Sequence, residues 1–164
     1  MKAYDIVKAL QRRHGAAGRS WALLPELRVG TGYKNLKANI NPEQRIDAWA
    51  ICLYPSKGLC RVAYEIKVSR SDFLHEIKNP EKRLQAMQYS NQFYFATPKG
   101  LVKPEEIPTE CGLVEIDEDG SSRYVVGAPY RDTEPDTWIH LLAAIARRAA
   151  KAEARIENPE LITG

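Results

Sequence analysis

The sequence predicts a single α/β domain that ends in a long helix. Apolar runs typical of strands are interleaved with segments in which apolar residues recur every three or four positions, as in amphipathic helices. The chain has 164 residues, enough for one domain with a substantial core but short for two. Hydrophobic residues make up 44% and charged residues 27%, which is ordinary for a soluble globular protein.

The N-terminal part of the chain is expected to form a helix and then a strand. Residues 3–14 carry apolar side chains at helical spacing, and glycines follow directly. His14, in the last turn, is expected to interact with the helix dipole. Residues 21–29 predict a first strand, in which Pro25 favours an edge position or a bend. The polar residues 30–44 are expected to form a loop.

The most informative pattern is a hairpin of two apolar strands, predicted at 45–53 and 59–68 and joined by the turn-forming sequence YPSKG. Glu65 and Lys67 are two apart on the second strand and therefore point to the same face. Pairing within the hairpin can bring Asp47 of the first strand beside them. Because such groups are costly to bury without partners, the pattern indicates either a structural ion pair or a metal site.

A further carboxylate precedes the hairpin. Glu26 lies among apolar residues of the predicted first strand. It is a candidate for an additional metal ligand, and an ion pair with Arg28 or Arg45 is the alternative.

Two helical segments are expected after the hairpin. Ser71 or Asp72 is the expected N-cap of the first segment. The second helix is predicted from Pro80, a first-turn proline, to about residue 90. On it Gln85 and Tyr89 are four residues apart and share a face.

The remainder of the chain is predicted to contain two short strands and the closing helix. The strands are expected at 92–97 and 112–116, and the helix at about 133–156. The buried stripe of this helix is predicted to contain Trp138, Leu141, Leu142, Ile145 and Ala149.

Charge is unevenly distributed along the chain. Six basic and two acidic residues precede residue 29, whereas residues 104–120 contain seven acids and no base. A polyanionic partner would be attracted to the first region and repelled by the second.

The cysteines and the hydropathy indicate the compartment. Cys52, Cys60 and Cys111 are widely spaced, without a CxxC motif, and are expected to pack in the core rather than to bind zinc or form disulfides. No signal peptide and no run of 18 apolar residues is present, so we expect a cytoplasmic protein that does not associate with membranes.

Several of these segments together resemble a known superfamily. Asp47, followed after seventeen residues by Glu65-Ile66-Lys67, resembles the signature of the PD-(D/E)XK nucleases, with Ile46 in place of the proline. Gln85 and Tyr89 resemble the Q-x-x-x-Y motif of the RecB-type branch. The blocks EIKVSRSDF (65–73), FYFATP (93–98) and GLVEID (112–117) resemble bacterial DNA-repair proteins of the MmcB type. The similarity covers roughly residues 45–130.

The resemblance implies a restriction-endonuclease-like core in a single domain. This core would occupy about residues 1–130, with a central mixed sheet of about four to five strands flanked by helices. It also implies a deoxyribonuclease that depends on Mg²⁺, with Mn²⁺ able to substitute. The implied metal ligands are Asp47, Glu65, the carbonyl oxygen of Ile66 and, by analogy, Glu26. The implied catalytic residues are Asp47, Glu65 and Lys67, with Gln85 and Tyr89 positioning the substrate or the lysine.

DNA is the partner that the resemblance implies, in a repair or processing role. A non-cutting DNA-binding module of the same fold and an α/β protein with a purely structural ion-pair network stay open as alternatives. A homodimer and a partner protein in repair also stay open, and no base-reading element is visible. The candidate phosphate contacts are Arg70, Lys78, Lys82 and Arg83.

Overall fold

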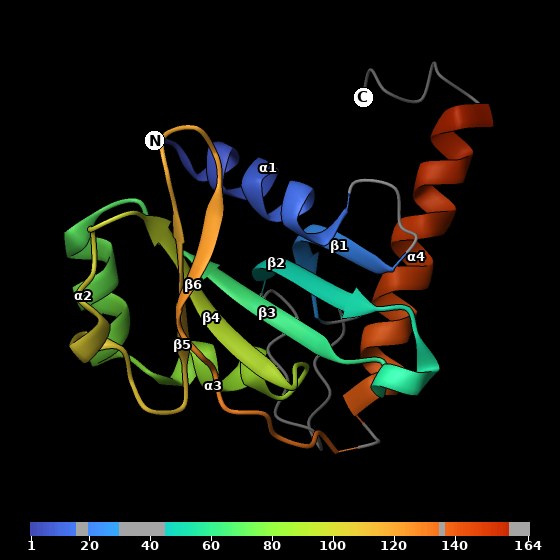
Figure 1. Cartoon of the computed structure of the whole chain (residues 1–164). Helices are drawn as coiled ribbons and strands as arrows, with labels where there is room; N and C mark the ends of the chain where they lie inside the picture. Colours follow the sequence, from blue (N-terminus) through green and yellow to red (C-terminus); the bar gives the residue numbers. More distant parts are fainter. Residues whose placement is uncertain (16–19, 30–44, 135–136, 158–164) are drawn as a thin grey trace. The chain divides into compact units, whose positions relative to one another are not determined.

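The computed structural model describes residues 1–15, 20–29, 45–134 and 137–157, so the predicted loop at 30–44 lies outside them (Figure 1). The chain divides into two compact units: Met1–Leu27 with Ile46–Thr133, and Arg28–Arg45 with Glu134–Gly164. The elements, in chain order, are α1 (Ala3–His14), β1 (Trp21–Arg28), β2 (Arg45–Cys52), the 3₁₀ turn η1 (Pro55–Lys57), β3 (Arg61–Ile66), α2 (Arg70–Lys78), α3 (Glu81–Met87), β4 (Gln92–Pro98), the 3₁₀ turn η2 (Pro104–Glu106), β5 (Gly112–Ile116), β6 (Ser122–Val126) and α4 (Thr137–Glu157).

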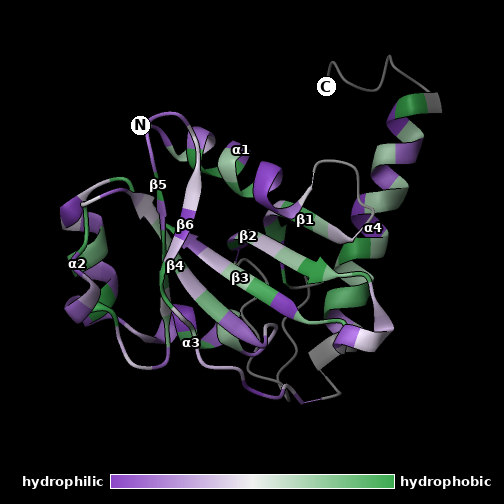
Figure 2. Cartoon of the chain, viewed as in Figure 1, coloured by the Kyte–Doolittle hydropathy of each residue, from purple (hydrophilic) through white to green (hydrophobic). Residues whose placement is uncertain are grey.

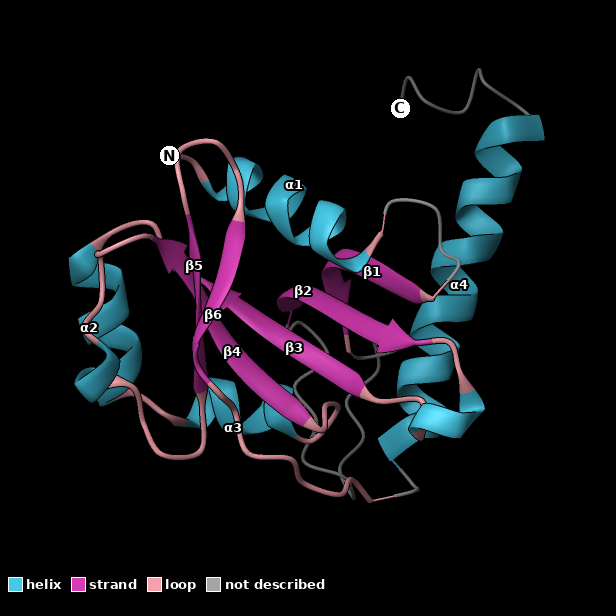
Figure 3. Ribbon diagram, viewed as in Figure 1, coloured by secondary structure: helices cyan, strands magenta, loops and turns pink. Residues whose placement is uncertain are grey.

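The six strands form one mixed sheet in the order in which they occur in the chain (Figure 3). β2 and β3 are antiparallel, as are β5 and β6, whereas β3, β4 and β5 run parallel. The α/β class and the mixed sheet are therefore confirmed. The sixth strand, β6, is an addition to the four to five strands expected, and none is predicted between residues 117 and 132, although Tyr124-Val125-Val126 after Asp119-Gly120 is a strand signal.

The strand register assigns alternate residues to the two faces of the sheet. Ala48 pairs with Tyr64, and Tyr64 pairs with Tyr94, so these side chains share one face. On this face Ile6 and Leu10 of α1 complete a buried cluster. In Figure 2, hydrophilic and hydrophobic residues alternate along α1, as expected for a helix that buries one side.

The opposite face of the sheet packs against α2 and α3. Phe73 of α2 contacts Phe95 of β4 edge to face, with ring centroids 5.3 Å apart. The indole Nε1 of Trp49 donates a hydrogen bond of 2.9 Å to the backbone oxygen of Tyr89. The aromatic residues of β2 and β4 thus fix the segment that runs between β3 and β4.

The N-cap of α2 is Ser69, and the predicted cap at Ser71 or Asp72 is wrong. Ser69 has an extended backbone, and its hydroxyl accepts a hydrogen bond of 3.2 Å from the Asp72 N–H. Asp72 instead lies in the first helical turn, where its negative charge is favourable beside the helix N-terminus.

The predicted C-terminal helix is present as α4, which begins at Thr137. Its predicted buried stripe is only partly correct. Leu141 is buried and Ile145 is half-buried, whereas Leu142 is 64% exposed and Ala149 is exposed. The side chain of Trp138 lies outside the described residues.

Within the described ranges, no helix combines the length and the apolar character needed to span a bilayer.

The three cysteines are free thiols, as expected from their spacing. Cys52 and Cys111 are buried and Cys60 is half-buried. Burial, assisted by the charge of Glu110, raises the pKa of Cys111 to about 12. A thiol held neutral in this way behaves as a small apolar core residue.

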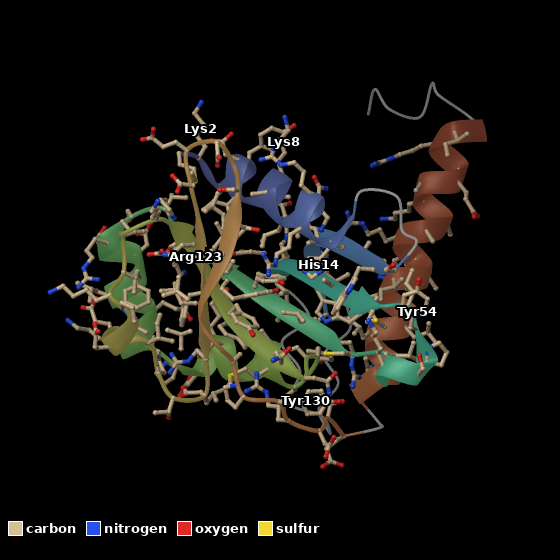
Figure 4. All side chains as sticks on the ribbon, in the orientation of Figure 1. Lys2, Lys8, His14, Tyr54, Arg123 and Tyr130 are labelled. Carbon is tan, nitrogen blue, oxygen red and sulfur yellow. The ribbon has the colours of Figure 1, made fainter. Side chains whose placement is uncertain are left out.

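His14 lies in the last turn of α1 (Figure 4) and is buried there, and its predicted interaction with the helix dipole stays a prediction. Its Nε2 lies 2.7 Å from the hydroxyl of Tyr64, which in turn lies 2.8 Å from the hydroxyl of Tyr124. Burial, with a smaller contribution from the charge of Arg13, lowers the pKa of His14 to about 4. The imidazole is therefore neutral near pH 7 and acts through hydrogen bonding rather than as a cation.

Acidification is expected to destabilise the fold through His14. Because the folded pKa of about 4 lies below the ordinary 6.5, the unfolded chain takes up the proton first as the pH falls. The contribution of His14 to the free energy of unfolding is therefore complete above pH 6.5 and is lost as the pH falls through 4. It amounts to at most about 3 kcal/mol. We expect His14→Gln to flatten the dependence of the unfolding free energy on pH, measured by urea denaturation. The exposed His75→Gln serves as a control, and equal slopes in both variants would contradict the assignment.

Candidate active site

Two carboxylates from neighbouring strands meet on the sheet face that packs against α2 and α3. The pairing of Ala48 with Tyr64, continued by one residue, sets Asp47 of β2 opposite Glu65 of β3. Glu65 is only 3% exposed, and Asp47 is half-buried. The Ile66 N–H donates a hydrogen bond of 2.9 Å to Asp47 Oδ2, which fixes that carboxylate.

The environment of Asp47 disfavours its negative charge. Burial raises the pKa of Asp47 to about 6, and the nearby charge of Glu65 adds to the increase. The hydrogen bond from Ile66 and the charges of Lys82 and Lys67 offset only part of it. Two hard oxygen ligands that repel one another in this way would be stabilised by a divalent cation.

Lys67 lies between two carboxylates. Its Nζ is 2.8 Å from Glu65 Oε1 and 3.2 Å from Glu76 Oε2, and its side chain is 12% exposed. Burial acts to lower the pKa of Lys67, but the hydrogen bonds and charges of Glu65 and Glu76 outweigh it, so the pKa is raised. The sequence-based expectation that Glu65 and Lys67 stand side by side is confirmed.

Glu76 of α2 is a member of this cluster that the sequence analysis missed. It is 5% exposed, and its Oε1 has no hydrogen-bond partner in the described part of the chain. A signal for it is present in the sequence: Glu76 follows the core residue Phe73 by three positions and therefore lies on the buried side of the helix. An acid at such a position needs a polar partner.

Among the described residues Glu26 is not brought into a metal-binding group, so its candidate role as an additional ligand is not supported. It is exposed on β1, with φ of 48°. No group of three or more His, Cys, Asp or Glu side chains that could hold a metal ion occurs among the described residues. The available donor set is therefore the pair Asp47 and Glu65, which matches the one or two carboxylates with which proteins usually hold Mg²⁺. The backbone N–H of Ile66 donates to Asp47. The backbone carbonyl of Ile66 stays a predicted metal ligand.

Gln85 and Tyr89 are not on one helix, because α3 ends at Met87. Gln85 is half-buried near the end of α3, and Tyr89 lies in the turn that follows. Among the described residues the buried hydroxyl of Tyr89 has no hydrogen-bond partner, so Tyr89 does not position Lys67 by a direct hydrogen bond. A role of Gln85 and Tyr89 in positioning the substrate stays a prediction.

The four predicted phosphate contacts occupy very different environments. Arg83 is 5% exposed and its Nη2 lies 2.8 Å from Glu110 Oε1, so it is a structural residue and its assignment to DNA is wrong. Arg70 is bound through Nη1 to Glu106 Oε2 at 2.6 Å. Lys82 lies 3.3 Å from Glu65 Oε1 and keeps a side chain that is 54% exposed. Lys78 is exposed on α2.

Comparison with known proteins supports the fold and no more. No protein-family model and no curated protein matches this chain. A solved structure is similar over 98% of this chain and 94% of its own, with a TM-score of 0.67 and 20% identity. It is described as the SPO1766 protein of unknown function from Silicibacter pomeroyi. The fold therefore defines this chain as an α/β protein with a six-stranded mixed sheet.

The metal-free protein is expected to become more stable when Asp47 loses its charge. The folded pKa of about 6 exceeds the ordinary 3.8, so the stabilising protonated form is present at low pH and is lost as the pH rises through 6. At neutral pH the ionised carboxylate therefore costs at most about 3 kcal/mol. Asp47→Asn retains an oxygen that can accept the Ile66 N–H. In EDTA at pH 7 we expect its melting temperature to rise by up to about 10 °C. The exposed Asp132→Asn is the control, and a lower melting temperature for Asp47→Asn would contradict the prediction.

Proposed function

We propose that this chain is a Mg²⁺-dependent deoxyribonuclease with a restriction-endonuclease-like core and a role in DNA repair or processing. The proposal rests on the arrangement of Asp47 and Glu65 from adjacent strands, with the ammonium of Lys67 2.8 Å from Glu65. It is supported by the sequence resemblance to the PD-(D/E)XK nucleases, whose signature these three residues match. The mixed sheet, with these residues on neighbouring strands, is compatible with that fold.

The residues divide the required chemistry among them. Asp47 and Glu65 would hold the cation, which supplies Lewis acidity toward a phosphate oxygen and lowers the pKa of a bound water. The hydrogen bond from Ile66 keeps Asp47 oriented, and the pairing of β2 with β3 keeps the two carboxylates side by side. Preorganisation of this kind avoids reorganisation when the substrate arrives.

Lys67 suits a charged role better than that of a base. Two of its three ammonium protons face the carboxylates of Glu65 and Glu76. These two carboxylates stabilise the positive charge of the Lys67 ammonium, and its third proton can be donated to a phosphate oxygen or to a water. A fixed cation at this place would stabilise the negative charge that develops on phosphorus-bound oxygens in the transition state.

DNA would reach the site past exposed lysines. Lys82 stands beside Glu65 with more than half of its side chain in solvent, and Lys78 is exposed on the neighbouring helix α2. Lys82 would exchange its contact with the buried Glu65 for a phosphate, and Arg70 would have to leave Glu106. The exposed Lys78 is therefore the candidate best tested by mutation.

A second candidate is a DNA-binding module of the same fold that does not cut. One observation favours it: Glu65 Oε1 already accepts hydrogen bonds from both Lys67 and Lys82, so its charge is compensated without a cation. The two candidates differ in cleavage but not in binding.

Cleavage of DNA should require both a divalent cation and Lys67. We expect the full chain to cut single-stranded, duplex or forked DNA with Mg²⁺ or Mn²⁺, and to stop in EDTA. Lys67→Met retains the apolar stem of the side chain, and loss of its positive charge should lower the rate at least about a hundredfold. The readout is release of labelled fragments, after thermal melting has shown that the variant is folded.

The control for this assay is Lys57→Met on the η1 turn, which should cut as the wild type does. Salt-sensitive binding without cutting would favour the non-cutting module. Neither binding nor cutting would mean that the cluster of Asp47, Glu65 and Lys67 is structural.

Phosphate contact by Lys78 should be visible in the salt dependence of binding. We expect Lys78→Ala to weaken binding about equally for all sequences and to lower the slope of log K against log salt by about one unit. Fluorescence anisotropy over a salt series in EDTA measures this slope without cleavage. An unchanged slope would remove Lys78 from the interface, and Lys57→Ala provides the matched comparison.

A further inference from the structure

The ammonium of Lys67 has two carboxylate partners that differ in what else they contact. Glu65 Oε1 is shared: it accepts from Lys67 at 2.8 Å and from Lys82 at 3.3 Å. Among the described residues, Lys67 is the recorded partner of the Glu76 carboxylate, through Oε2 at 3.2 Å, and Oε1 makes no hydrogen bond. Glu76 is thus available to Lys67 even when Glu65 binds something else.

A cation bound by Asp47 and Glu65 would compete directly with Lys67 for Glu65. A divalent ion and an ammonium repel one another, so its arrival weakens the contact between Lys67 and Glu65. With a side chain that is 12% exposed, Lys67 cannot replace that contact fully with water. An ammonium left unpaired in such a place is costly, and this cost would be subtracted from the affinity for the metal.

The position of Glu76 is set by contacts that do not involve the candidate metal site. Phe73, three residues earlier on α2, packs edge to face on Phe95 of the sheet. The backbone oxygen of Glu76 accepts a hydrogen bond of 3.4 Å from Arg83 Nη1, and Arg83 is itself paired with Glu110. Because these contacts hold the helix, the Glu76 carboxylate would stay in place when the charges around Glu65 change.

We propose that Glu76 is a positioning residue of the candidate site: it holds the Lys67 ammonium in place when a divalent cation takes over Glu65. This inference rests on the proposed function, since it requires that Asp47 and Glu65 bind a metal ion. It assigns a role to an acid outside the D…E-x-K signature. It also explains a buried carboxylate of α2 that plain packing of the helix does not require.

The charges of the cluster agree with this role. Asp47, Glu65 and Glu76 carry three formal negative charges, and two positive charges come from Lys67 and Lys82. Without the charge of Glu76, the two remaining carboxylates and the two lysines would sum to zero net charge. A divalent cation would then meet a weaker attraction and a lysine that competes for Glu65, and both effects would lower its affinity.

The experiment is a calorimetric titration of the full chain with MnCl₂ in the absence of DNA. We expect Glu76→Gln to raise the Mn²⁺ dissociation constant by about tenfold or more, a range seen for residues that orient metal ligands indirectly. The matched control is Glu81→Gln on α3, which removes one negative charge from an exposed residue and should change the constant by less than about twofold. Thermal melting checks that each variant is folded, and Glu76→Asp, which keeps the charge but shortens its reach, replaces Glu76→Gln if the latter unfolds.

A double-mutant cycle tests whether Glu76 acts through Lys67. In a Lys67→Met background there is no ammonium to hold, so Glu76→Gln should weaken Mn²⁺ binding only through its lost negative charge, and clearly less than it does in the wild-type background. An equally large effect in both backgrounds would mean that Glu76 acts as a ligand or as a general charge, and would overturn the inference. Equal effects of Glu76→Gln and Glu81→Gln in the wild-type background would overturn it as well.

The failure of this inference and that of the proposed function are distinguishable. Wild-type binding of Mn²⁺ that is lost in Asp47→Asn, together with unchanged binding in Glu76→Gln, overturns the role of Glu76 and leaves the metal site intact. No binding of Mn²⁺ to the wild type overturns both.

Discussion

The structure depends on the antiparallel register of β2 and β3. Because side chains alternate along a strand, this register sends Ala48 and Tyr64 to the face covered by α1. It sends Trp49, and with it the pair Asp47 and Glu65, to the face covered by α2 and α3. A slip of β2 by one residue would turn its side chains to the opposite faces and place Asp47 in the apolar core beneath α1. The apolar residues therefore specify the position of the charged ones.

Stability alone does not account for the charged cluster of Asp47, Glu65, Lys67 and Glu76. Glu65 and Glu76 are almost completely buried, and their desolvation offsets much of the attraction to Lys67. Apolar residues of similar volume at these positions would often be as stable or more so. Asp47 adds a carboxylate whose charge is disfavoured by burial and by Glu65. A site that tolerates such repulsion is typical of one that binds a cation or a charged substrate.

The sequence predicts those features that follow from local periodicity. The period of two along β3 places Glu65 and Lys67 together, and the helical period of α1 gives that helix its observed bounds. The features it fails to predict depend on contacts between elements. Whether Arg83 faces solvent or Glu110, and whether Glu76 reaches Lys67, depends on how α2 and α3 pack on the sheet. Spacing along a short helix contains little information about that packing, because two or three turns allow several orientations of the buried side.

The two lysines that contact Glu65 differ in their exposure to solvent. Lys67 lies inside it with 12% of its side chain exposed, whereas Lys82 contacts the same Glu65 oxygen from the solvent side with 54% exposed. Within the proposed function, an approaching phosphate would meet Lys82 first; the exposed ammonium of Lys82 can exchange its contact with Glu65 for the phosphate or for water, while Glu65 keeps its contact with Lys67. Lys67 has no such option and depends on Glu76. Within the proposed function, the exposed Lys82 is therefore suited to binding DNA and the buried Lys67 to the chemical step.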